Sequence, residues 1–238
     1  MTTLRSAFAA EMENLEKQLL RMGSFVENML ATATRALVEQ NEALANEVIL
    51  RDDIADEMDL NIEHACMRLL ALQQPVAKDL RTIGTALKII TDLERIGDYS
   101  VDIARMAKKL SGEPYFKPLE DIPRMSQMVT SMVRDALRSF VDRDLNLVRQ
   151  VCEKDQQVDD LWHALMEELI QRMEQDPRLV RQATALLLVA RYLERIGDHA
   201  TNVAERVHYT ETGELVQIAR PHRPRLDERE PGGSAPQP

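Results

Sequence analysis

The chain has 238 residues, with 30 Lys and Arg against 40 Asp and Glu, so its formal net charge is −10. An acidic chain lacks the basic footprint of a nucleic-acid binder, and we expect no nucleic-acid partner. The longest uninterrupted apolar run, near 185–190, is far shorter than the roughly 20 residues that a membrane span needs. We therefore expect no direct membrane insertion, and residues 1–10 do not have the pattern of a secretory signal.

The composition predicts helices throughout the first 212 residues. Hydrophobic residues make up 44% of the chain but aromatic residues only 4%, which is typical of packed helices. Breaks are expected near 41–46, at Gln73-Gln74-Pro75, at 111–114 and at Asp176-Pro177. The expected helices are 4–43, 48–73, 78–110, 121–143, 147–174 and 178–209.

The sequence contains an internal duplication. The run Leu93-Glu94-Arg95-Ile96-Gly97-Asp98 recurs unchanged at 193–198, an offset of 100 residues, and earlier positions match at an offset of 103, as Met22 matches Met125. Three helices with short connections in each copy predict an all-α fold of two tandem three-helix bundles. The expected division is 1–113 for the first repeat, 114–212 for the linker and second repeat, and 213–238 for a disordered tail.

Apolar residues in the last helix of each repeat recur at spacings of three and four, which predicts a core-facing seam. Gly97 and Gly197 lie beside this seam. Glycine inside a helix costs about 1 kcal/mol relative to alanine, so its presence in both copies suggests a close helix crossing. Simple inheritance of the glycine by both halves is the alternative.

Acidic residues form stripes at helical spacing in both repeats. At about 100° per residue, the stripe on the last helix of each repeat is expected to point nearly opposite the seam. Distances from the intervening turn predict that Asp56 and Asp98 lie at similar heights in an antiparallel pair. The last-helix stripes are Glu94, Asp98 and Asp102, and Glu194, Asp198 and Asn202. The middle-helix stripes are Asp52, Asp56, Asp59 and Glu63, and Asp155 and Asp159 followed by Trp162 and Met166.

Facing carboxylates on two helices repel one another, and a cation removes that repulsion. Oxygen ligands suit hard ions such as Mg, Mn, Ca or iron, so the stripes are candidate metal ligands. The first repeat offers the richer set, because Asn202 replaces an acid in the second. The other interpretation is an ordinary solvated face, with Arg95 and Arg195 paired to nearby acids. The candidate ligands are Asp52, Asp56, Glu94, Asp98, Asp102, Asp155, Asp159, Glu194, Asp198 and Asn202.

A second functional hypothesis rests on two other spacings. Glu205-x-x-His208 and the looser Asp160-x-x-His163 have the spacing of di-metal carboxylate proteins, which predicts a helical-bundle oxidase or hydrolase. That architecture needs two such motifs and further Glu ligands, so the signal is weak. Cys66 and Cys152 are isolated and are expected to be free, buried thiols in a reducing cytoplasm.

The duplicated three-helix pattern with Leu-Glu-Arg-Ile-Gly-Asp in each copy resembles the PhoU family, bacterial accessory regulators of phosphate transport. Residues 74–81 and Met22-Gly23 fit the same pattern, and the resemblance covers about residues 4–209. It implies a non-enzymatic, six-helix protein of the cytoplasm, often a homodimer. It also implies repression of phosphate uptake through the ATPase subunit of the phosphate ABC transporter, and inhibition of the phosphate-sensing histidine kinase. Some members bind multinuclear iron or zinc clusters at the matching acidic motifs.

Overall fold

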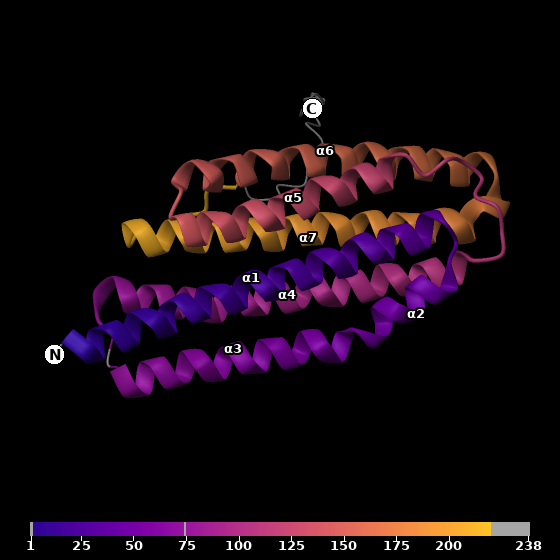
Figure 1. The fold of residues 1–238 in the computed structure, drawn as a ribbon. Helices are drawn as coiled ribbons and strands as arrows, with labels where there is room; N and C mark the ends of the chain where they lie inside the picture. The colour runs from indigo at the N-terminus through magenta and orange to yellow at the C-terminus, as the bar shows by residue number, and fades with distance from the viewer. Residues whose placement is uncertain (1, 74, 220–238) are drawn as a thin grey trace, which may run out of the picture.

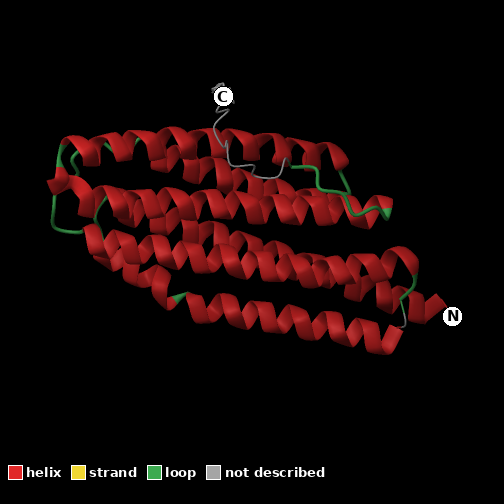
Figure 2. Cartoon of the chain, turned by 180° about the vertical axis from the view of Figure 1, so that it is seen from behind, coloured by secondary structure: helices red, strands yellow, loops and turns green. Residues whose placement is uncertain are grey.

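The fold consists of long helices arranged as two bundles lying side by side (Figure 1). It is a computed structural model that describes residues 2–73 and 75–219. That part of the chain contains no strand, as Figure 2 shows, so the all-α prediction is confirmed. The helices are α1 (Thr2–Val38), α2 (Glu42–Leu50), α3 (Asp52–Gln73), α4 (Ala77–Leu110), α5 (Asp121–Asp142), α6 (Leu145–Gln175), the short 3₁₀ helix η1 (Pro177–Leu179) and α7 (Val180–Thr212).

The first repeat contains α1 to α4 and the second contains α5 to α7, so the duplication is visible in the architecture. The helices α4 and α7, which carry the repeated motif, pack against each other along their length, and so do α1 and α5. The interface between repeats is therefore built from these four helices. Within the described residues, no helix is both long and apolar enough to cross a membrane.

The predicted turn at 41–46 and the single helix over 48–73 were wrong. The turn that follows α1 contains Gln40, which adopts a positive φ of 52°. The Asn41 side chain then accepts hydrogen bonds from the N–H groups of Ala43 and Leu44, so a new helix begins at Glu42. α2 ends at Leu50. The N–H of the next residue, Arg51, donates a hydrogen bond to the Val48 carbonyl before α3 starts.

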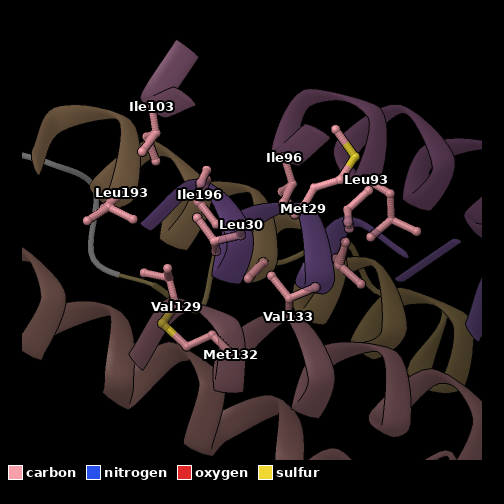
Figure 3. Packing of buried hydrophobic residues seen from close by; sticks show 14 of the residues in the cluster. Met29, Leu30, Leu93, Ile96, Ile103, Val129, Met132, Val133, Leu193 and Ile196 are labelled. Atoms are coloured by element: carbon pink, nitrogen blue, oxygen red, sulfur yellow. The ribbon is translucent and has the colours of Figure 1, made fainter. Parts of the chain in front are cut away.

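The core runs without interruption from one repeat into the other. Figure 3 shows buried side chains from α1, α4, α5 and α7 packed together, with Leu93 and Ile96 of the first repeat and their counterparts Leu193 and Ile196 in the same cluster. All four are at most 1% exposed, which confirms the seam. A single core of mostly Leu, Ile, Val, Ala and Met therefore spans both repeats.

A pseudo-twofold relationship governs the contact between α1 and α5. At the offset of 103, Gly23 corresponds to Ser126 and Thr34 to Leu137. Thr34 and Ser126 share a hydrogen bond of 2.8 Å between their hydroxyl groups. In the equivalent place a Cβ on Gly23 would stand 2.0 Å from Cδ1 of Leu137. The small residue therefore leaves room for the large one.

The chain continues along the bundle for a short distance after α7. Gly213, with φ of 79°, ends the helix. The Glu205 carboxylate then accepts hydrogen bonds from the backbone N–H groups of Ile218 (2.7 Å) and Ala219 (3.1 Å). The rest of the predicted tail, 220–238, lies outside the described residues.

Candidate functional site

The acidic stripes of α3 and α4 lie against each other in the first repeat. The pKa of Asp52 is raised by burial and then by the charges of Asp98 and Asp56. The pKa of Glu94 is raised by burial and then by Asp98, with Asp56 and Asp59 adding to the effect. Carboxylates from two helices are therefore close enough to repel each other, as expected. Asp98 acts on Asp52 and Asp56 acts on Glu94, and a Cβ on Gly97 would stand 3.7 Å from Cβ of Ala55, so α3 and α4 are adjacent at this level.

Arginines partly balance this face. Arg95 donates to Asp98 at 3.0 Å, and Arg105 donates to Asp102 at 2.9 Å. The pairing expected for Arg95 is confirmed, and Arg195 likewise donates to Asp198 at 2.9 Å. The side chains of Arg95 and Arg105 are more than half exposed, so these pairs add little stability.

The last-helix stripe of the second repeat is buried at one end, because Glu194 is 1% exposed while Asn202 is exposed. Asp155 of the middle-helix stripe is also buried, at 6% exposed. The predicted orientation of the stripe considered a single seam, but α7 packs against α4, α5 and α6, so little of its circumference remains for solvent.

The second repeat holds its acids by local contacts. The Glu194 carboxylate accepts a hydrogen bond of 2.5 Å from Arg191, whose guanidinium lies 5.8 Å from the centre of the Trp162 ring. Asn202 points to Asp92 of the first repeat, with 3.4 Å between Nδ2 and Oδ1. Trp162 stands at the position that corresponds to Asp59 of the first repeat, and its ring contacts the guanidinium of Arg191. The two acidic faces have therefore diverged.

The first-repeat face suits a hard cation in its chemistry but is not a formed cage. Its donors are carboxylate oxygens, and burial, followed by the charges of neighbouring carboxylates, raises the pKa of Asp52 and of Glu94. Within the described residues, however, no three His, Cys, Asp or Glu side chains converge closely enough to hold a metal ion. Metal binding therefore stays a prediction, and it requires the carboxylates to change rotamers.

The two motifs of the enzyme hypothesis lie apart. Glu205 is engaged by the segment after α7 and lies near Cys152, whose pKa it raises. Cys152 precedes Asp160 by more than two turns of α6, and the side chain of His163 is exposed. Glu205 and Asp160 therefore do not form a joint site.

Sequence analysis missed a pair that joins the repeats. His199 of α7 lies with Nδ1 2.8 Å from Oδ1 of Asp92 on α4, and both side chains are about 15% exposed. At the offset of 100 their counterparts are Tyr99 and Tyr192, whose rings stack at 5.8 Å between centroids. The sequence alone does not show that these residues pair, because the pairing depends on the antiparallel register of α4 and α7.

The fold and the sequence agree with known proteins. The family model described as the PhoU domain matches residues 19–107 and 122–207. A phosphate-specific transport system accessory protein PhoU homolog of Clostridium acetobutylicum is 44% identical over 90% of this chain and 98% of its own length. A protein of the same name from Aquifex aeolicus is 44% identical over 87% of this chain and 94% of its own.

Solved structures agree as well. The crystal structure of PhoU from Pseudomonas aeruginosa superposes with a TM-score of 0.82 at 38% identity, covering 87% of this chain and all of that one. The phosphate transport system regulatory protein PhoU from Streptococcus pneumoniae gives a TM-score of 0.83 at 31% identity, covering 88% of this chain and 99% of its own. With two domain matches that coincide with the two bundles, this chain belongs to the PhoU family.

Proposed function

We propose that this protein is a negative regulator of phosphate uptake and of phosphate-starvation signalling, acting in the cytoplasm without catalysing a reaction. The observation that carries the proposal is the match to proteins named phosphate-specific transport system accessory proteins over 98% and 94% of their lengths. A duplicated helical bundle with a continuous core presents broad surfaces, which suits action through protein contacts.

The proposed partners are the ATPase subunit of the phosphate ABC transporter and the phosphate-sensing histidine kinase. The net charge of −10 favours basic patches on the partners and association that weakens as salt rises. A pull-down with the purified ATPase subunit, at low and at high ionic strength, tests this. Binding should fall with salt and should survive removal of residues 220–238, which keeps the segment held by Glu205. Binding that is indifferent to salt, or that is lost with residues 220–238, would contradict the proposal.

We further propose that the first-repeat acidic face binds divalent or trivalent cations, such as iron, zinc, Mg or Mn, more tightly than the second. The support is the raised pKa of Asp52 and Glu94 and the all-oxygen donor set. Calorimetric titration with Mn²⁺ should show weakened binding in Asp98→Ala, a smaller effect in Asp198→Ala and none in the control Glu57→Gln. Equal binding by all variants would place the cation elsewhere.

A homodimer is the proposed assembly. The support is a series of large apolar side chains exposed on the first repeat, including Leu60 (53%), Met67 (54%) and Leu72 (70%). Exposed apolar surface of this kind is typical of contact between copies. Light scattering after gel filtration should give twice the mass of 27.2 kDa for the wild type and a shift toward 27.2 kDa for Leu60→Gln/Met67→Gln. A wild-type monomer would refute it.

A further inference from the structure

A groove in the first repeat is lined by cations and amides in an otherwise acidic protein. It lies between α1 and α3, with a volume of about 630 Å³, and α3 runs along the outer edge of the bundle (Figure 1). That size is within the range of small-molecule sites. We call it the α1–α3 groove, and its lining residues are Gln18, Arg21, Met58, Asn61, Ile62, His64, Ala65 and Arg68.

The α1–α3 groove concentrates positive charge, because no carboxylate lines it. Among the described residues, Arg21 has no hydrogen-bonding or ion-pair partner, and Arg68 has only a long contact of 3.4 Å with Glu11. His64 and Arg68 follow one face of α3 at a spacing of four. Two guanidinium groups, one of them without a partner, share this groove with amide donors, and that combination suits an anion.

The second repeat shows that this charge is not a general property of the bundle. At the offset of 103, the positions of Gln18 and Ala65 hold Asp121 and Glu168. Both of these acids form ion pairs with Lys117 of the linker, so the equivalent place in the second repeat is occupied by its own paired charges. The positions of His64 and Arg68 hold Glu167 and Gln171. Only the arginine corresponding to Arg21, Arg124, is retained.

The layout of the groove indicates the class of ligand. The contact between Glu11 and Arg68 sets the register of the antiparallel helices, and counting ten residues along each brings Arg21 beside Met58. Met58 and Arg68 are about 15 Å apart along α3, so the two arginines stand at opposite ends. A single inorganic phosphate ion is too small to contact both ends.

The middle of the groove suits a flat, polar ring. Gln18 and Asn61 offer carboxamides, which can donate and accept on the edge of a nucleobase, and Met58 and Ile62 supply apolar contact surface. Arg21 is the cation without a partner and so is the phosphate-binding end, whereas Arg68 and His64 can stack on a base. We propose that the α1–α3 groove binds a nucleoside phosphate, a function separate from the regulatory one proposed above.

Calorimetric titration of the full chain with ATP tests this, with EDTA present so that no divalent cation bridges phosphate to the acidic face. The wild type should bind ATP, and Arg21→Gln should weaken binding about tenfold or more. The matched control is Arg124→Gln, which removes the equivalent arginine from the second repeat and should bind as the wild type does. Arg21 is exposed, and circular dichroism checks that each variant keeps its helices.

Separate titrations with adenosine and with inorganic phosphate identify the part of the ligand that is recognised. Each should bind at least about tenfold more weakly than ATP, because each contacts only one end of the groove. Absence of ATP binding, equal binding by Arg21→Gln, or equal loss in Arg124→Gln would overturn the proposal. Inorganic phosphate that binds as tightly as ATP would also overturn it, in favour of a simple phosphate site.

Discussion

Asp92 and His199 join the two repeats through a contact of 2.8 Å that its pseudo-symmetric counterpart, Tyr99 with Tyr192, does not reproduce chemically. At one of these two equivalent positions, α4 and α7 are thus joined by a carboxylate and an imidazole, and at the other by stacked rings. The duplication preserved the geometry of the interface while the side chains diverged. The same holds for α1 and α5, where a hydrogen bond in one half replaces a leucine packed on Gly23 in the other.

The pair formed by Asp92 and His199 should contribute to stability as a unit. Both side chains are mostly buried, so removing one partner leaves the other without its main contact. In urea unfolding, a double-mutant cycle of Asp92→Asn and His199→Gln should give a coupling energy of about 1 kcal/mol. Additive effects of the two substitutions would show that they do not interact in solution.

Gly97 and Gly197 should respond differently to alanine. A Cβ on Gly97 would meet Ala55 and Val26 at the ordinary distances of 3.7 and 3.8 Å, so Gly97→Ala should stabilise the protein by up to about 1 kcal/mol through helix propensity. A Cβ on Gly197 would stand 3.3 Å from Oδ1 of the buried Asp155. Gly197→Ala should therefore gain less or destabilise. The thermal midpoints of the two variants decide this, and a larger gain for Gly197→Ala would contradict the close crossing.

Neutralising the acidic face should stabilise the metal-free protein near neutral pH. Asp52 and Glu94 have pKa values raised in the folded state, so stability falls as pH rises from their ordinary values of 3.8 and 4.5 through the raised ones. Asp98→Asn removes the main charge acting on both and should reduce that loss as pH rises above these ordinary values. Urea unfolding in EDTA measures it, with Glu57→Gln as the control. A less stable Asp98→Asn at pH 7 would mean that the ion pair with Arg95 outweighs the repulsion.

The two thiols should react slowly in the folded protein. Burial raises the pKa of Cys66 and of Cys152 to about 12, with Glu63 and Glu205 adding smaller effects. The thiolate is the reactive form, so little alkylation by iodoacetamide is expected at pH 8 until urea unfolds the chain. Rapid modification of Cys152 before unfolding would show that α6 opens locally.

The helices, the duplication and the core-facing seam could be predicted from the sequence because they are local or periodic. Pro75 and Pro177 mark breaks, and the repeated motif at 93–98 and 193–198 aligns the halves. The break at Arg51 has no proline or glycine and was missed.

The site was less predictable, because burial depends on how many neighbours a helix has. Glu194 and Glu94 occupy equivalent positions, yet Glu194 is buried and Glu94 is partly exposed. The α1–α3 groove and the Asp92–His199 pair depend on side chains from separate helices. Their proximity follows only from the tertiary register.

Phosphate uptake by cells that lack this protein tests the regulatory account most directly. In phosphate-rich medium, deletion of its gene should raise the rate of phosphate uptake and switch on phosphate-starvation genes, and restoring the wild-type gene should reverse both. Uptake and expression that stay unchanged after deletion would contradict the proposal that the protein restrains the phosphate transporter and its signalling.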